Sequence, residues 1–351
     1  MITGTVLAIQ ANYYRVGLDI VAEIDYPCPE LLCIRRARLK KTGQNVYVGD
    51  RIAVEEPDWQ GERGAISGIF PRRNLLERPM VANVDRVVLA FALAEPQIDP
   101  YQLSRFLVNL ASQDLEVLLC FTKRDLVTPE FWYGWSDRLK NWGYKPLAIS
   151  VNTGEGLEEL RSCLSEGVSV ITGQSGVGKS SLINFLIPDL NIRVNEVSAK
   201  LGLGRHTTRH VELFPIGDRG LLADTPGFTQ PTLTCEPINL IDCFPEIQNS
   251  QGSCQFRDCL HLNEPKCGIR GDWERYEHYC LFLQEAFAYE TSQEAIATAD
   301  KSLKSKSGQG GTTKEEPRLV TKSHRRNSRR SSHQQLEGSY SEELRKEDSD
   351  N

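Results

Sequence analysis

The spacing of apolar residues predicts short strands in the first part of the chain. In residues 1–75, alternating runs such as TGTVLAIQ, LLCIRRARLK and NVYVGDRIAV are broken by turns at Ala11–Asn12 and Gly49–Asp50. Alternation with period two is typical of half-buried strands, and several short strands at near-regular spacing predict a small barrel. An OB-type barrel fits, and such barrels commonly bind oligonucleotides. A β-module with a purely structural role fits the same pattern.

Residues 76–232 follow a different pattern. Continuous apolar runs, VDRVVLAFAL, LEVLLC, VSVITG and GLLA, alternate with helical stretches such as YQLSRFLVNLASQD and KSSLINFLI. Buried strands that alternate with helices predict an α/β domain with a parallel sheet. Four polar motifs follow the ends of these strands, which is the edge where open α/β sheets bind ligands.

The last part of the chain divides again. Residues 233–290 are rich in cysteine and end in a helical run, DWERYEHYCLFLQEAFAYE, which predicts a small α domain. Residues 291–351 are rich in Ser, Lys, Arg and Glu and should be disordered, because they cannot bury enough apolar surface. Within them RRNSRRSS is either an arm that contacts RNA or a solubilising extension. The chain is therefore expected to be multidomain.

Composition narrows the location and the partners. No stretch of 18 apolar residues occurs, and MITGTVLAIQ lacks the features of a secretory signal. We therefore expect a cytoplasmic protein without a membrane partner, whose ten cysteines are thiols or metal ligands rather than disulfides. The net charge of -6 argues against a wholly basic nucleic-acid binder, although local patches can still contact RNA. One basic run is either such a patch or a solvated strand face: Arg35, Arg36, Arg38, Lys40 and Lys41.

The segment GQSGVGKSS fits the phosphate-binding pattern G-x-x-x-x-G-K-[ST] at every position. Its backbone N–H groups can surround the phosphates of a nucleotide. Lys179 would neutralise the β- and γ-phosphates, and the Ser180 hydroxyl would ligate Mg²⁺. The residues expected to bind the phosphates are Gly173, Gln174, Ser175, Gly176, Val177, Gly178, Lys179, Ser180 and Ser181.

Two further segments can complete the magnesium site. Asp224, in DTPG after an apolar strand, can hold Mg²⁺ through water, and the Gly227 N–H can reach the γ-phosphate. Thr207 and Thr208 lie in the polar, glycine-rich GLGRHTTRH. A threonine there can complete the Mg²⁺ shell and sense the γ-phosphate, as in switch loops. An ordinary flexible loop is the alternative.

Guanine would be recognised upstream of the phosphate loop. Asp125, in the TKRD segment of Thr122, Lys123, Arg124 and Asp125, can accept from both N1–H and the 2-amino group. Ser150, Val151 and Asn152 open SVNTGEG and could present a backbone N–H to guanine O6. The alternative for TKRD is a surface charge cluster. An ordinary small GTPase has the phosphate loop first, so the reversed order indicates a circularly permuted domain.

A cluster of metal-ligand residues lies in SCQFRDCLHLNEPKC. Three thiolates and one imidazole can complete one closed tetrahedral Zn²⁺ site with a structural role. Reduced cysteines packed in a small core are the alternative. The four expected ligands are Cys254, Cys259, His261 and Cys267.

These motifs, in this order, resemble the RsgA family, also called YjeQ. The resemblance covers residues 1 to about 290 and includes the cysteine pattern C-x4-C-x-H-x5-C. It implies a monomeric GTP hydrolase (EC 3.6.1.-) that converts GTP to GDP and phosphate when stimulated by the small (30S) ribosomal subunit. Its OB-fold barrel and zinc domain would contact the subunit and its 16S rRNA. The reaction would assist late 30S maturation, including release of the assembly factor RbfA.

The resemblance also marks a catalytic candidate and two departures. Phe228 stands where Ras-like enzymes place a water-orienting glutamine, so slow intrinsic hydrolysis is expected, and His206 could orient the water instead. Thr122 replaces the usual asparagine of the guanine motif, and Arg209 replaces a common threonine. Two other functions stay open. One is an RNA- or ribosome-binding assembly module with a mainly structural nucleotide site, and the other is a regulatory GTPase with a non-ribosomal protein partner.

Overall fold

The structure is a computed structural model. It divides into two compact units, residues 1–289 and residues 290–351. It describes residues 2–19, 26–41, 43–77, 79–113, 115–188, 211–223, 233, 235–248, 254–271, 273–307 and 313–317. Among the helices of these ranges, none has the length and hydropathy that a bilayer crossing requires.

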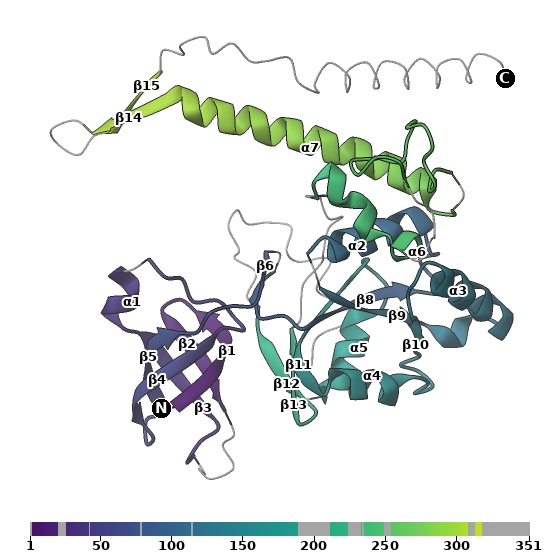
Figure 1. Cartoon of the computed structure of the whole chain (residues 1–351). Coiled ribbons are helices and arrows are strands. Elements are labelled where there is room, and N and C mark those ends of the chain that lie inside the picture. The colour runs from purple at the N-terminus through teal and green to yellow at the C-terminus, as the bar shows by residue number, and fades with distance from the viewer. Residues whose placement is uncertain are drawn as a thin grey trace. The chain divides into compact units, whose positions relative to one another are not determined.

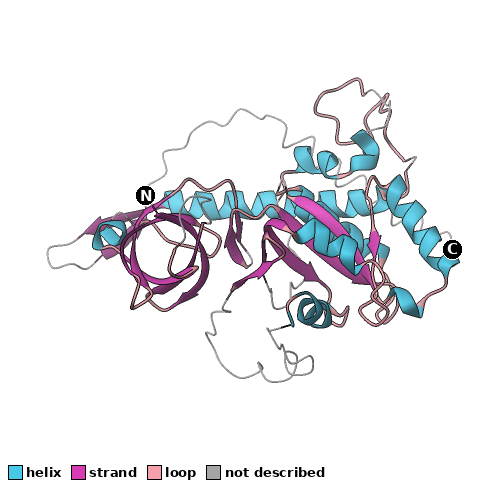
Figure 2. Cartoon of the chain, turned by 90° about the horizontal axis from the view of Figure 1, so that it is seen from below, coloured by secondary structure: helices cyan, strands magenta, loops and turns pink. Residues whose placement is uncertain are grey.

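The N-terminal strands form a closed barrel, seen end-on in Figure 2. Its strand order is β1-β2-β3-β5-β4, with β4 paired back to β1 and β3 parallel to β5, which confirms the expected OB-type barrel. Buried and less buried residues alternate in β2, β3 and the start of β5, as period-two patterning requires, whereas β1 and β4 contain continuous buried runs. The barrel core includes Val6, Val16, Leu31, Cys33, Ile52, Val54 and Ile66. The elements are β1 (Ile2–Gln10), β2 (Tyr13–Leu18), β3 (Glu30–Arg35), α1 (Ala37–Lys41), β4 (Arg51–Asp58) and β5 (Arg63–Ile69).

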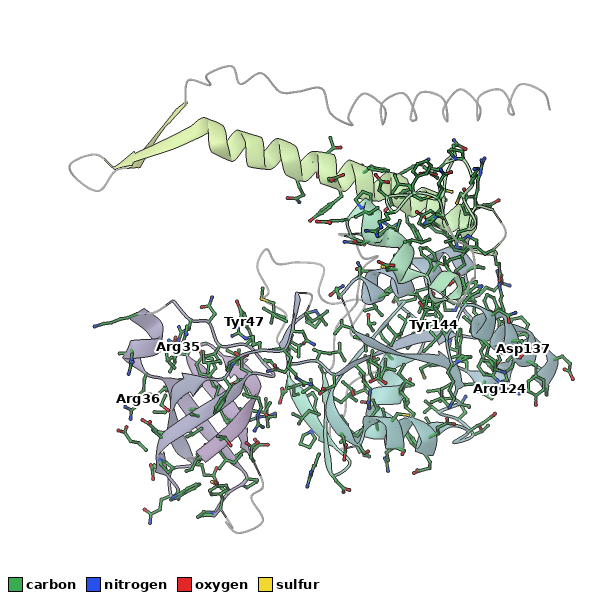
Figure 3. The ribbon with its side chains drawn as sticks, viewed as in Figure 1. Arg35, Arg36, Tyr47, Arg124, Asp137 and Tyr144 are labelled. Atoms are coloured by element: carbon green, nitrogen blue, oxygen red, sulfur yellow. The ribbon has the colours of Figure 1, made fainter. Side chains whose placement is uncertain are left out.

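Two local expectations differ from the structure. The apolar residues before Gly49 do not form a strand, and only Val48 makes an isolated bridge, to Val81. The basic run is not a single strand face, because β3 ends at Arg35 and α1 begins two residues later. Arg36 forms ion pairs with Glu55 and Glu56, and Figure 3 shows Arg35 and Arg36 beside α1.

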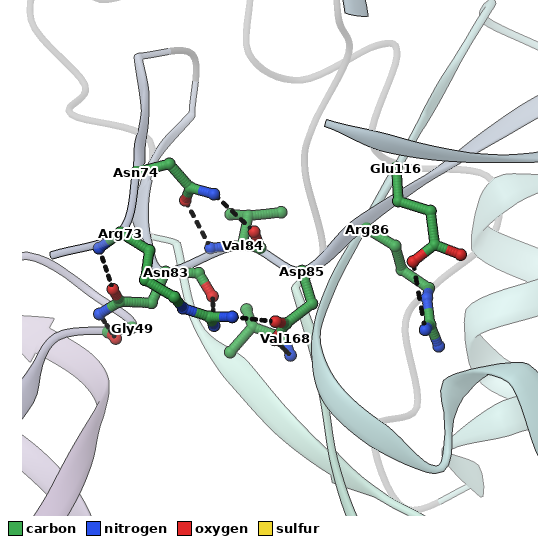
Figure 4. Close-up of polar contacts among 9 residues, drawn as sticks. All are labelled: Gly49, Arg73, Asn74, Asn83, Val84, Asp85, Arg86, Glu116 and Val168. Carbon is green, nitrogen blue, oxygen red and sulfur yellow. Dashed lines mark hydrogen bonds and ion pairs between the residues drawn. The ribbon is translucent and has the colours of Figure 1, made fainter. Parts of the chain in front are cut away.

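A short hairpin joins the barrel to the next domain, and its asparagines fix the junction (Figure 4). Asn83 donates to the Gly49 carbonyl of the barrel at 2.9 Å, while its own Oδ1 accepts the backbone N–H of Arg73 at 2.9 Å. Asp85 accepts from the Arg73 guanidinium at 2.6 Å and from the Val168 N–H at 2.8 Å. The hairpin consists of β6 (Leu75–Glu77) and β7 (Met80–Ala82), so the boundary expected after residue 75 falls inside it.

The middle of the chain forms a six-stranded sheet in the order β10-β9-β8-β11-β13-β12. The strands pair in parallel except β12, an antiparallel edge strand. The neighbours β8 and β11 are separated in the chain by β9, β10 and their helices. The strands are β8 (Arg86–Ala92), β9 (Glu116–Thr122), β10 (Leu147–Ala148), β11 (Glu166–Gly173), β12 (Leu213–Ile216) and β13 (Arg219–Ala223).

Helices cover both faces of this sheet (Figure 1). Val87, Leu89 and Phe91 of β8 face the cluster that contains α2 and the end of α3, whereas Val88 faces α4 and α5. The α2 helix begins at Pro100 because the Asp99 side chain accepts two N–H groups of its first turn. The helical elements are α2 (Pro100–Ala111), η1 (Arg124–Leu126), α3 (Pro129–Asn141), α4 (Leu157–Leu164) and α5 (Lys179–Leu186).

The cysteine-rich region packs against α2 through its own apolar cluster. Val108 of α2 shares this cluster with Leu240, Phe244 and Tyr279. The Arg275 guanidinium is fully buried, pairs with Glu246 and lies over the rings of Trp142 and Phe244. The elements are η3 (Pro237–Cys243), α6 (Pro245–Gln248) and α7 (Tyr276–Ser302).

The chain after residue 290, expected to be disordered, contains two described segments. The α7 helix continues to Ser302, through the helix-favouring sequence SQEAIATADK. The strands β14 (Leu303–Ser307) and β15 (Thr313–Pro317) form an antiparallel pair. Residues 318–351, with the RRNSRRSS segment, lie outside the described residues.

Candidate nucleotide and metal sites

The phosphate-binding motif forms the turn between β11 and α5. Gly173, Gly176 and Gly178 all have positive φ, a conformation that glycine adopts without strain. At Gly173 a Cβ would lie 2.0 Å from the Ala90 carbonyl oxygen, so no other residue fits beside β8. The Lys179 ammonium donates to the carbonyl of Gly173 at 2.8 Å and to that of Gln174. The first turn of α5 therefore presents backbone N–H groups and a cation at one place, a combination suited to phosphate.

Thr122 connects the guanine motif to this loop. It ends β9 with only 3 % of its surface exposed. Its hydroxyl lies 2.5 Å from the Val177 carbonyl and 3.2 Å from that of Phe91. One hydroxyl proton can serve only one of these acceptors at a time, and Val177 is the nearer. The threonine thus joins β9 to the phosphate loop, a role the sequence reading did not assign to it.

Asp125 lies beside the start of the second guanine motif. Its Oδ1 accepts from the Ser150 hydroxyl at 2.6 Å, and its Oδ2 accepts from the Asn152 amide at 3.0 Å. These bonds, Ser150 first, lower the pKa of Asp125 below its ordinary value, because they favour the charged carboxylate. Each carboxylate oxygen has two lone-pair positions, so each can accept another donor. The carboxylate is thus oriented and can accept the two N–H groups on one edge of guanine.

The loops that carry these side chains are fixed by their backbones. The Arg124 N–H donates to the Ile149 carbonyl at 3.0 Å, which ties the two guanine motifs together. Lys123 adopts the left-handed conformation, and its ammonium contacts the Glu95 carbonyl. The Arg124 guanidinium faces Glu155 at 3.7 Å, and Figure 3 shows Arg124 near α3. Val151 follows the buried Ser150 in this turn.

The structure brings the guanine motifs and the phosphate loop to one edge of the sheet. β8, β9 and β11 are adjacent, and Thr122 spans the distance between the two loops. If the strands are counted from β11, the phosphate loop comes first and the guanine motifs last. The remaining expected nucleotide or magnesium residues lie outside the described residues: His206, Thr207, Thr208, Asp224 and Gly227.

The four metal-ligand residues also come together, with all donor atoms within 4.8 Å of one another. Cys254 and Cys267 have their Sγ atoms 3.8 Å apart, and both lie close to His261 Nδ1, at 3.4 and 3.5 Å. Bond lengths of about 2.3 Å to sulfur and about 2.0 Å to nitrogen give tetrahedral edges of about 3.8 Å and about 3.5 Å. The cluster therefore fits a tetrahedral Zn²⁺, with Nδ1 as the histidine ligand.

Hydrogen bonds also hold the loop around the cluster. Glu264 accepts the backbone N–H groups of Leu260 and Leu262 at 2.7 and 2.8 Å. The hydroxyl of Tyr276 donates to the His261 carbonyl at 2.8 Å. Burial raises the pKa of Cys259 to about 12, so a cation is needed to keep this sulfur as a thiolate at neutral pH. The donor set is closed, which suits a structural site.

Comparison with known proteins identifies the family of the chain. Residues 69–234 match the model of the RsgA GTPase family. The chain is 51% identical to the small ribosomal subunit biogenesis GTPase RsgA of Trichormus variabilis, over 97% of both chains. The corresponding protein of Synechocystis is 49% identical, over 95% of this chain and 94% of the relative. A mitochondrial relative from Arabidopsis thaliana is 41% identical, over 99% of this chain and 88% of the relative.

Solved structures give the same answer for the fold. YjeQ from Thermotoga maritima superposes with a TM-score of 0.68 at 30% identity, covering 82% of this chain and 98% of that one. The circularly permuted GTPase YloQ gives a TM-score of 0.67 at 29% identity, covering 82% and 96%. The reversed motif order, the permuted sheet and these relatives together show that the chain belongs to the RsgA family of circularly permuted GTPases.

Proposed function

We propose that the protein is a GTP hydrolase that binds the small (30S) ribosomal subunit and assists its late maturation. The observation that chiefly supports GTP as the substrate is the arrangement of Asp125, Ser150 and Asn152. Thr122 links this group to the phosphate loop. The ribosomal partner is supported by the relatives, which are named small ribosomal subunit biogenesis GTPases.

Guanine would bind through the Asp125 carboxylate, which accepts N1–H and the 2-amino group, with a backbone N–H of residues 150–152 at O6. Lys123 would lie along the base. The phosphates would bind the backbone of residues 173–181, with Lys179 at the β- and γ-phosphates. Mg²⁺ supplies charge neutralisation at the phosphates when bound, and its proposed ligands are Ser180, Asp224 and Thr207 or Thr208.

The other domains would hold the enzyme on the subunit. We assign residues 1–75 to an RNA-binding barrel, 76–232 to the nucleotide domain, 233–290 to the zinc domain and 291–351 to a tail. The barrel and the zinc domain would contact 16S rRNA. One structural Zn²⁺ on the Cys3His cluster would keep the zinc domain rigid. Hydrolysis of GTP to GDP and phosphate by the monomer in the cytoplasm would be coupled to release of RbfA.

The deciding experiment measures phosphate release from GTP by the full chain, with and without small subunits, and uses ATP as control. Stimulation by the subunit that is selective for GTP is the expected result. GTP turnover unchanged by subunits would favour a regulatory GTPase with another protein partner. Subunit binding without any turnover would favour an assembly module with a structural nucleotide site.

His206 is the proposed group that orients the attacking water. His206→Ala should reduce subunit-stimulated turnover by about 100-fold or more, the lower end of the usual contribution of a positioned acid–base group, while GTP affinity stays within about twofold. Unchanged stimulated turnover in this variant would exclude His206 from the reaction. His210→Ala, at the nearby histidine in the same segment, is the matched control.

A further inference from the structure

Two cysteines outside the metal cluster line one cavity at the start of the C-terminal module. Cys235 precedes η3, and Cys243 is its last residue. The cavity has a volume of about 310 Å³ and lies between η3 and the end of α2. Its lining consists of Ala111, Ser112, Cys235, Glu236, Asn239, Asp242 and Cys243.

The two thiols differ in burial and in hydrogen bonding. Cys243 is buried, with 4 % of its surface exposed, whereas Cys235 is half-buried. The Cys235 thiol donates to the Glu236 carbonyl at 3.4 Å, and the Cys243 thiol donates to the Asn239 carbonyl at 3.9 Å. The neighbouring Cys243 thiol lowers the pKa of Cys235, and the influence of Cys235, followed by burial, raises the pKa of Cys243. An accessible sulfur on the same cavity as a buried thiol is the arrangement of an attacking and a resolving cysteine.

The surroundings of the pair indicate what it can react with. The carboxylates of Glu236 and Asp242 line the same cavity, whereas the cavity lining contains no Lys, Arg or His. A cationic reagent should therefore be favoured over an anionic one. A metal ion fits this pair less well. Among the described residues, the group of three or more potential metal ligands is the Cys3His cluster, and Cys235 and Cys243 do not belong to it.

We propose that Cys235 and Cys243 are a redox-active dithiol that forms a reversible disulfide by exchange with a small cationic disulfide. The Cys235 thiolate attacks one sulfur of R–S–S–R, forms a mixed disulfide and releases R–S⁻, which takes up a proton. Cys243 then gives up its proton and attacks the Cys235 sulfur, releasing the second thiol. In total two protein thiols lose two electrons and two protons, and one R–S–S–R becomes two RSH.

Oxidation would join the residue that precedes η3 by two positions to the last residue of η3. Leu233, just before Cys235, is buried in the same cluster as Leu240 and Phe244. Because η3 follows the strands of the nucleotide domain in the chain and precedes the Cys3His cluster, this disulfide would stiffen the connection between them. The inference does not depend on GTP hydrolysis or on ribosome binding.

The test treats the full, zinc-loaded chain with cystamine and follows each cysteine by alkylation and peptide mass spectrometry. The expected product is a Cys235–Cys243 disulfide that dithiothreitol reverses, with zinc retained. Cys235 should react at least about tenfold faster than the half-buried Cys163, because exchange rate follows thiolate content and access. The anionic reagent 3,3′-dithiodipropionate should react more slowly at Cys235 than cystamine.

Two variants separate the roles of the sulfurs. Cys243→Ser should accumulate a mixed disulfide at Cys235, because the resolving thiol is missing, whereas Cys235→Ser should leave Cys243 unmodified. Circular dichroism verifies that both variants are folded. The proposal is overturned if wild-type Cys235 reacts no faster than Cys163, or if no Cys235–Cys243 peptide forms while both residues are oxidised separately. Both of those results come from the wild-type chain and stand even if a variant fails to fold.

Discussion

Replacing Thr122 by valine tests whether a hydroxyl connects the guanine motif to the phosphate loop. Valine has nearly the same shape, so the substitution removes the contacts to the Val177 and Phe91 carbonyls without opening a cavity. With 3 % of the residue exposed, water cannot replace the lost donor. Loss of such a buried hydrogen bond costs about 1 to 2 kcal/mol.

This cost should appear mainly as stability. A loss of about 1 to 2 kcal/mol in a domain of this size lowers the unfolding temperature by about 2 to 8 °C. The contact exists in the protein without nucleotide, so only part of its loss reaches the binding equilibrium. We expect the dissociation constant for GDP to rise by at most about tenfold, which corresponds to about 1.4 kcal/mol.

The assay combines thermal unfolding with a fluorescent GDP titration of wild type, Thr122→Val and Thr122→Ser. The serine variant keeps the hydroxyl and loses the methyl group, so it should retain nucleotide affinity close to wild type. If the valine variant unfolds and binds GDP like wild type, the hydroxyl does not join the two loops. Equal damage in both variants would instead assign the effect to packing of the methyl group.

Three further predictions concern other sites. Asp125→Asn should weaken GTP binding by about 2 to 4 kcal/mol. The variant should instead favour xanthosine triphosphate, because the C2 carbonyl of xanthine can accept from the new amide. A nucleotide titration that shows no change of preference refutes this. Cys259→Ser should lose the metal and loosen the C-terminal module, and one retained zinc equivalent by elemental analysis would refute the ligand assignment. Glu246→Ala leaves the fully buried Arg275 without its ion-pair partner and should lower the free energy of unfolding, measured by chemical denaturation, by about 3 to 5 kcal/mol. Glu116→Ala, which removes an exposed ion pair, should lower it by less than about 1 kcal/mol. Similar losses in the two variants would contradict the argument.

Much of the architecture could be read from the chain because local patterns carry it. The alternation in TGTVLAIQ and LLCIR predicts strands that the barrel confirms as β1 and β3. The apolar runs at the centre predict buried parallel strands, since both faces of such strands meet helices. The strand predicted before Gly49 was wrong, because the apolar residues there pack without continuous strand pairing. The helix into residues 291–302 was missed, since low hydrophobicity does not prevent helix formation by Ala, Glu and Gln.

The sequence by itself determined which chemical groups this protein has and in what order: an aspartate that can accept from guanine, then a phosphate loop, then four residues that can ligate zinc. Only the tertiary structure decided which groups meet across long separations in the chain. In the sequence, Thr122 is only a departure from the usual asparagine of the guanine motif. The fold places its hydroxyl against the carbonyl of Val177, 55 residues further along. Cys235 and Cys243 look like ordinary thiols until folding places both on one cavity. Motif chemistry is encoded locally, whereas such contacts depend on strand order and packing, which no short stretch of sequence contains.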